Sequence, residues 1–152
     1  LKKIKKKKYM FFNINYDSFP IIKITIDTNF ISGETFQLFL DKWEEINNMK
    51  KKYILIFDTS KCGLINIKYI YKLTKFINTL KNLKEKNLEY SIIYVRNKIV
   101  KNLLNITFKI QKPISYTFIV NDYDDIDIIN KDITYIINNY QKMSSKFYLV
   151  YP

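Results

Sequence analysis

The side chains that could do chemistry in this chain stand where its apolar, strand-like segments end. Asp27, Asp58, Arg96 and the pair Asn121 and Asp122 each follow such a segment. Because the carboxyl ends of parallel strands meet at one edge of an α/β sheet, these groups could form a small polar site that holds a metal ion or a phosphate. Paired carboxylates could also do acid and base work if their surroundings separated their pKa values. Polar residues begin wherever strands end, however, so we expect no catalytic site and interpret the chain as a non-enzyme.

The residue types that are missing exclude whole classes of enzyme. The chain has no histidine and a single cysteine, Cys62, which rules out Ser-His-Asp and Cys-His catalysis and a structural zinc site. Its two glycines, Gly33 and Gly63, stand alone, so no Gly-rich phosphate loop is present. Lys61 could lower the pKa of the neighbouring Cys62 thiol, but we expect a lone loop cysteine to be inert. We therefore expect no metal and no cofactor, and a single cysteine, which allows no internal disulfide, favours a cytoplasmic protein.

The chain is strongly basic, and almost all of its cations are lysines. It has 152 residues, of which 47% are hydrophobic, a net charge of +12, and Arg96 as its one arginine. Such a charge should attract acidic partners, although a chain rich in Ile, Asn and Lys is also what an AT-rich genome encodes. Proteins that read a nucleic-acid sequence rely on arginine for their contacts to bases. A chain with one arginine is therefore not expected to bind a specific nucleic-acid sequence. No run of about 18 apolar residues is present, so no membrane span is expected.

The first lysines form a separate candidate site. Six of the first eight residues are lysines, and aromatic residues follow them directly. Such a segment could make a weak contact with polyanions, either nucleic acid or an anionic membrane, through an attraction that salt reduces. The residues for this alternative function are Lys2, Lys3, Lys5, Lys6, Lys7 and Lys8.

Hydrophobic periodicity predicts a series of strands and helices. Residues 10–16 and 21–27 alternate apolar and polar side chains around a turn at 17–20, which is typical of a β-hairpin. The apolar run at 53–57 is typical of a central strand covered by helices. Ser32 can cap a helix with the apolar stripe Phe36, Phe39, Leu40, Trp43 and Ile46. Asn66 can cap a second helix with the stripe Ile67, Ile70, Leu73, Thr74, Ile77 and Leu80.

The rest of the chain continues this alternation. The expected elements are a strand at 90–95, a short helix at 97–104, a strand at 114–120, a helix from near Asp124, and a segment at 146–151 that could form an extra edge strand. The order β-β-α-β-α-β-α-β-α predicts a single α/β domain with a mostly parallel central sheet and an N-terminal β-hairpin. This domain covers residues 9–140, between a basic tail at 1–8 and an extension at 141–152.

The order of elements and four passages resemble the STAS domain, the fold of bacterial anti-sigma-factor antagonists and of the cytoplasmic tails of sulfate transporters. The resemblance spans roughly residues 10–140 and is one of pattern and spacing. The passages are Ile26 to Trp43, with the turn and the first helix; Ile54 to Ser60, a strand that ends in Asp; Leu64 to Leu73, at the place of the family's switch; and Tyr90 to Val95 with the helix after it.

The residues at the switch depart from the family pattern. In the antagonists, a serine at the mouth of the second helix is phosphorylated and this controls partner binding. Asn66 and Ile67 stand at the matching Asp and Ser positions, and Tyr69 stands where the family has a glycine. Ile67 cannot accept phosphate, so the resemblance implies a STAS-like module that lacks the usual phosphorylatable serine.

We therefore expect a non-catalytic protein-protein interaction module. Its candidate contact residues lie in the loop after the central strand, at the start of the second helix and after the next strand: Thr59, Ser60, Lys61, Asn66, Ile67, Lys68 and Arg96. Lys61 and Lys68 would steer an acidic partner, and Thr59 and Ser60 are hydroxyls that could be phosphorylated. Further alternatives are a structural building block and a lipid carrier of the CRAL-TRIO kind, for which the chain is too short to add the helices that close a large cavity. Composition defines neither the partner nor the oligomeric state.

Overall fold

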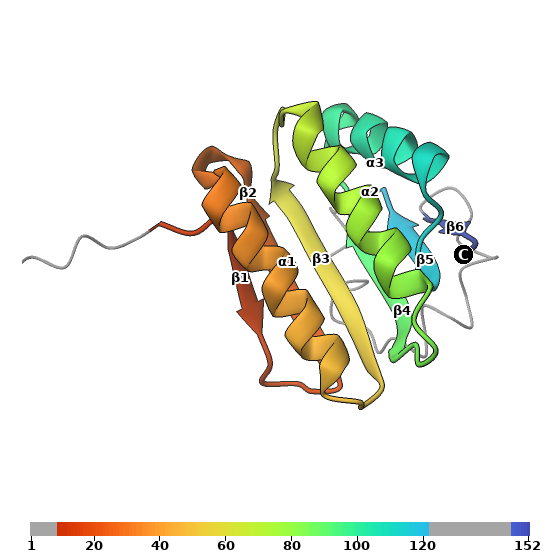
Figure 1. Ribbon diagram of the computed structural model, residues 1–152. Coiled ribbons are helices and arrows are strands. Elements are labelled where there is room, and N and C mark those ends of the chain that lie inside the picture. The colour runs from red at the N-terminus through yellow and green to blue at the C-terminus, as the bar shows by residue number, and fades with distance from the viewer. Residues whose placement is uncertain (1–8, 122–146) are drawn as a thin grey trace, which may run out of the picture.

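A six-stranded sheet with helices on one face forms the part of the chain that the computed structural model describes, residues 9–121 and 147–152 (Figure 1). The strands are β1 (Phe12–Asn15), β2 (Ile21–Asp27), β3 (Tyr53–Lys61), β4 (Leu88–Tyr94), β5 (Tyr116–Val120) and β6 (Phe147–Val150). The helices are α1 (Gly33–Asn48), α2 (Ile67–Lys81) and α3 (Lys98–Ile110), and a short 3-10 helix, η1 (Thr28–Phe30), follows β2.

The strand order follows the chain order, and this explains why the helices share a face. β2, β3, β4 and β5 run parallel, and each crossover between them carries one of α1, α2 and α3. Right-handed crossovers that step in one direction keep their helices on the same side of a sheet. Figure 1 shows the three helices side by side in front of the strands.

The edges of the sheet make it mixed, so the prediction of a mostly parallel sheet is wrong. β1 pairs antiparallel with β2, and β6 pairs antiparallel with β5. A short turn such as residues 16–20 cannot carry the chain back across the sheet, so it joins antiparallel neighbours only. β6 lies within the 146–151 segment for which the sequence allows an edge strand. The helix expected from near Asp124 falls outside the described residues, so the described order ends in β5 and β6.

Short polar side chains begin each of these helices. Ser32 and Thr35 form a reciprocal capping box at the start of α1. The side-chain oxygen of Asn66 accepts from Lys68 N at 3.0 Å in α2, and α3 has a similar cap. These bonds satisfy amides that no helical carbonyl can reach. α3 extends to Ile110, six residues beyond the expected end at 104, because apolar core contacts continue through Phe108.

The side of the sheet that faces the helices carries the larger core. The predicted apolar stripe of α1 is confirmed, since all of it is buried with Ile22, Ile24 and Leu55 of the sheet. Most of the predicted α2 stripe is buried or half-buried as well, but Ile67 is exposed. The other face of the sheet has a second buried cluster: Ile54, Ile56, Ile92, Tyr94, Phe118 and Val120. β3 and β4 therefore contribute to the core on both faces, as the unbroken apolar run at 53–57 predicts for a central strand.

Candidate functional site

The loop between β3 and α2 is held in place by hydrogen bonds from two other segments. The amide of Gly63 donates to the hydroxyl of Thr28 in η1 at 2.7 Å. The side-chain amide of Asn97, just before α3, donates to the carbonyl oxygen of Cys62 at 3.1 Å. Loop residues 62–66 therefore have fixed positions at the carboxyl end of the parallel strands, where α/β proteins commonly place their binding sites.

Three of the expected contact residues, Thr59, Ser60 and Lys61, lie in β3 and not in this loop. β3 continues to Lys61, four residues beyond the predicted end of the strand. Thr59 is only 7% exposed, and its hydroxyl donates to the carbonyl oxygen of Tyr94 in β4. Ser60 is half-buried, and its amide donates to the carboxylate of Asp58 at 2.9 Å. The Thr59 hydroxyl is thus buried and bonded to the backbone of β4.

Apolar side chains are exposed on the fixed loop and beside it. Leu64 is 81% exposed and Ile67, in the first turn of α2, is 51% exposed. Phe30 in η1 is 40% exposed, and its ring stacks on Tyr9 with the ring centroids 5.0 Å apart. The hydrogen bond of the Gly63 amide to η1 connects the segments that carry Leu64 and Phe30. We call Phe30, Leu64 and Ile67 the apolar edge.

Sequence reasoning finds Ile67 but misses Leu64 and Phe30. Hydrophobic periodicity does not predict whether either residue is buried or exposed, because Leu64 precedes a helix and Phe30 lies in a single 3-10 turn. The only signal in the sequence for Leu64 is that an apolar residue follows the glycine of a short loop.

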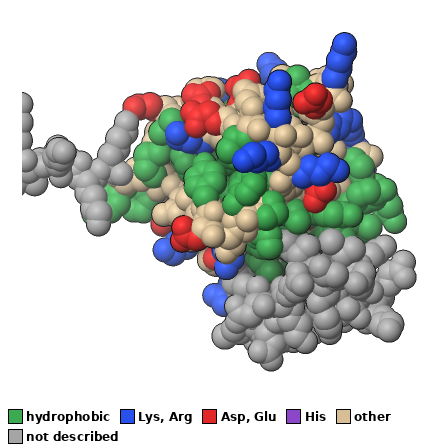
Figure 2. Space-filling view, turned by 90° about the horizontal axis from the view of Figure 1, so that it is seen from below, with side chains coloured by type: hydrophobic (Ala, Val, Ile, Leu, Met, Phe, Trp, Pro, Cys, Tyr) green, Lys and Arg blue, Asp and Glu red, His purple; other side chains and the backbone are tan. Residues whose placement is uncertain are grey.

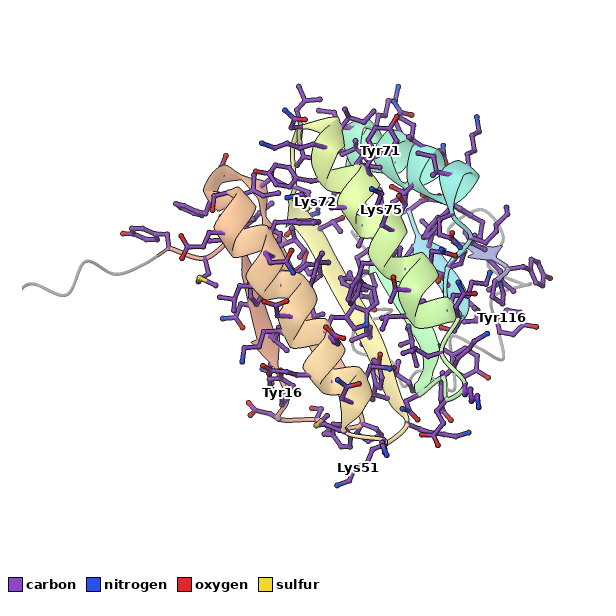
Figure 3. All side chains as sticks on the ribbon, in the orientation of Figure 1. Tyr16, Lys51, Tyr71, Lys72, Lys75 and Tyr116 are labelled. Atoms are coloured by element: carbon purple, nitrogen blue, oxygen red, sulfur yellow. The ribbon has the colours of Figure 1, made fainter. Side chains whose placement is uncertain are left out.

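Basic side chains are exposed on the segments that carry the apolar edge and on the segment after β4. Lys61, Lys68 and Arg96 are all exposed at this end of the molecule. The ammonium group of Lys68 lies 5.0 Å from the ring centroid of Tyr69, a cation-π contact. The basic side continues along the outer face of α2, where Figure 3 shows Tyr71, Lys72 and Lys75 on the side of the helix that faces away from the sheet. Expected residues from three segments therefore meet in one surface that is apolar in part and basic in part.

The two carboxylates expected at strand ends accept hydrogen bonds from backbone amides; Asp27 does end β2, but Asp58 lies within β3. A carboxylate oxygen of Asp27 accepts from Asn29 N at 3.1 Å, and Asp58 accepts from Ser60 N. Burial raises the pKa of the Cys62 thiol to about 12, and the carboxylates of Asp58 and Asp27 act in the same direction. The thiol is therefore protonated at neutral pH, and the expected influence of Lys61 on it is outweighed. Within residues 9–121 and 147–152, no three Cys, Asp or Glu side chains gather as metal ligands would.

The opposite end of the molecule has a mixed surface. Figure 2 views this end, and lysines there are interspersed with acidic and hydrophobic side chains. Figure 3 places Tyr16 and Lys51 at this end, and Lys52 pairs with Glu89 at 3.5 Å. The six N-terminal lysines proposed for polyanion binding, and Asp122, fall outside the described residues. None of the described helices has both the length and the apolar character needed to cross a membrane.

Comparison of the chain with protein-family models, with curated proteins and with solved structures returns no match. What the structure itself defines is an α/β protein with a mixed six-stranded sheet in its described residues.

Proposed function

We propose that this chain is a non-catalytic protein-interaction module that binds its partner through the apolar edge and the adjoining turns of α2. The observation that carries the proposal is the exposure of Leu64 and Ile67 on a backbone that hydrogen bonds hold in place. Large apolar side chains cost free energy when they face water, and several together on a fixed surface mark an interaction site. A prearranged loop also loses little conformational entropy when the partner binds.

The charges around the apolar edge favour an acidic partner. Lys61, Lys68 and Lys72 are exposed beside it, whereas the nearby carboxylates of Asp27 and Asp58 are half-buried. A partner segment with an apolar anchor flanked by Asp or Glu would fill the apolar edge and face the lysines. Such complementarity chiefly raises the rate of association and the specificity.

The resemblance to STAS domains supports the same surface by analogy. That family uses the mouth of its second helix for partner binding, and Ile67 is the residue at that place here. Because Ile67 has no hydroxyl, we propose that binding is not controlled by phosphorylation at this position.

Binding experiments with matched variants test this proposal. Proteins captured from source lysate by the full chain are identified, purified and titrated against wild type, Leu64→Asp, Ile67→Asp and Leu83→Asp. Leu83 is exposed after α2 and outside the apolar edge, so Leu83→Asp is the matched control. Leu64→Asp and Ile67→Asp should each weaken binding by about tenfold or more, as for residues central to an interface, while Leu83→Asp stays within about twofold.

Two outcomes would contradict the proposal. Equal binding by wild type, Leu64→Asp and Ile67→Asp would remove the apolar edge from the contact. Recovery of nucleic acid or anionic lipid alone, released by salt and lost when residues 1–8 are deleted, would favour the polyanion-binding function instead.

A further inference from the structure

An apolar pocket of about 180 Å³ lies between the helices and the sheet, beneath α2. Side chains from α1, α2, α3 and the central strands line it, among them Trp43, Phe57, Leu73, Ile93, Leu104 and Phe108. It reaches from the loop after β3, where Gly63 and Ile65 line it, to Leu88 and Ile114 near the amino ends of β4 and β5. Protein interiors are normally packed with few voids larger than a water molecule, so a space of this size needs a cause.

Small residues in one row of the sheet account for this space. Across the strands, Ile22 is paired with Leu55, Leu55 with Ser91, and Ser91 with Thr117. The row therefore changes from large apolar side chains on β2 and β3 to small polar ones on β4 and β5. The α3 residue Thr107 also lines the pocket and is buried. Leucine or isoleucine at Ser91 and Thr117 would fill the space, so the sequence itself keeps it open.

The lining offers a ligand almost no polar contact. The hydroxyls of Thr59, Thr107 and Thr117 donate to the backbone carbonyls of Tyr94, Leu103 and Ser115. The Cys62 thiol is protonated and lies 3.8 Å from the carbonyl oxygen of Ile26. None of the residues that line the pocket carries a charge at neutral pH. An ion would therefore lose its hydration without gaining a charged partner, and a polar molecule would meet mainly apolar side chains.

We propose that this apolar pocket binds a small, uncharged hydrocarbon, with the dimensions of one aromatic ring or a short alkyl chain. Its volume is close to that of the roughly 150 Å³ apolar cavity that remains dry and binds benzene in another protein. Occupancy would replace the dispersion contacts that the open space forfeits. The proposal does not depend on the contact surface, because Leu64 and Ile67 do not line the pocket.

Titration with toluene tests the proposal directly. Trp43 is the only tryptophan and lines the pocket, so its fluorescence and calorimetry should both report saturable binding. Benzoate, which has a similar shape but carries a charge, should not bind. Ser91→Leu fills the pocket and should weaken toluene binding by about tenfold or more. Ser18→Leu makes the same change in the exposed turn before β2 and should leave affinity within about twofold of wild type.

A second variant keeps the proposal testable if Ser91→Leu does not fold. Leu104→Ala enlarges the pocket at a half-buried position, so it should shift preference from toluene toward n-butylbenzene by several-fold. Absence of saturable toluene binding by wild type would overturn the proposal. Unchanged toluene binding by folded Ser91→Leu, or an unchanged preference in Leu104→Ala, would overturn it too. Binding of a protein partner is measured separately and can fail or succeed independently of these results.

Discussion

Asn97 joins the start of α3 to the candidate contact loop, because its side-chain amide donates to the carbonyl oxygen of Cys62 at 3.1 Å. The oxygen of the same side chain accepts from Val100 N at 2.9 Å. A single residue therefore caps a helix and anchors a loop, and these two roles can be separated by substitution.

Replacement of Asn97 should weaken both the helix and the loop. Asn97→Ala removes the cap and should lower the free energy of unfolding by about 1–2 kcal/mol in urea titrations. Asn97→Asp keeps an oxygen that can cap α3 but has no amide to donate to Cys62. Hydrogen exchange at the Gly63 amide should therefore accelerate in both variants, while exchange at the Val100 amide should accelerate only in Asn97→Ala.

The control for this pair is Asn102→Ala, an exposed position on α3. It should change the free energy of unfolding by no more than about 0.5 kcal/mol. Unchanged exchange at the Gly63 amide in Asn97→Asp would show that the loop keeps its position without the bond to Cys62.

A buried chain of hydrogen bonds connects α1 to β3. Trp43 Nε1 donates to the hydroxyl of Tyr53 at 3.2 Å, and that hydroxyl donates to the side-chain oxygen of Asn47 at 3.3 Å. Tyr53 is fully buried. Tyr53→Phe should therefore cost about 1–3 kcal/mol of unfolding free energy, since it leaves two buried polar groups without this partner. The matched control is Tyr16→Phe at an exposed position, which should be close to neutral in the same denaturation experiment. A neutral Tyr53→Phe would mean that water or other groups replace the lost bonds.

The fold could be predicted from the sequence where periodicity was strong. The buried α1 stripe and the hairpin of β1 and β2 both follow from the spacing of apolar residues. The mixed character of the sheet could not, because the direction of the last strand depends on which neighbour it pairs with. The sequence also predicts too short a β3, since Asp58 and Ser60 are typical turn residues that here continue the strand.

The candidate site was predictable in part for a similar reason. The sequence predicts Ile67 both in a buried stripe and in the contact surface, and its exposure excludes the first prediction. The sequence places Thr59 on the surface because it follows the strand predicted at 53–57, yet its bond to Tyr94 depends on the pairing of β3 with β4. The sequence does not predict the apolar pocket, because the pairing of Ser91 with Thr117 is known only once β4 and β5 are placed side by side. The length of the chain predicts no large cavity closed by extra helices, but small side chains create a pocket without additional helices.

Alkaline pH should destabilise the protein from about pH 9 upward. Burial raises the pKa of Cys62 from 9.0, and those of Tyr53 and Tyr94 from 10.0, to about 12 in each case. The unfolded chain loses these protons at the lower, ordinary values, while the folded chain keeps them. Because the unfolded state then binds fewer protons, the free energy of unfolding falls as pH rises between about 9 and 12. Urea denaturation at pH 8, 9, 10 and 11 would measure this slope.

The Cys62→Ala variant isolates the part of this slope that belongs to the thiol. The decline should begin nearer pH 10 in the variant, because only the tyrosines with raised pKa values remain among these three groups. Equal slopes for wild type and Cys62→Ala between pH 9 and 10 would contradict the assignment. Only the slopes are compared, since the variant also loses the weak hydrogen bond that the thiol donates to the carbonyl oxygen of Ile26.

The neighbouring hydroxyls of Thr59 and Ser60 should respond very differently to a negative charge. Thr59 is buried with its hydroxyl on the Tyr94 carbonyl, so Thr59→Asp would place a carboxylate in the sheet against a carbonyl oxygen. An uncompensated buried charge should cost about 3 kcal/mol or more, whereas Ser60→Asp, at a half-buried position, should cost well under half of that. Thermal denaturation of Thr59→Asp, Thr59→Val and Ser60→Asp would compare them, and Thr59→Val should lose only the hydrogen bond, about 1 kcal/mol. A stable Thr59→Asp would mean that this end of β3 can open, and phosphorylation of Thr59 would then be compatible with the fold. The expected loss of stability would instead restrict any modification in this segment to Ser60.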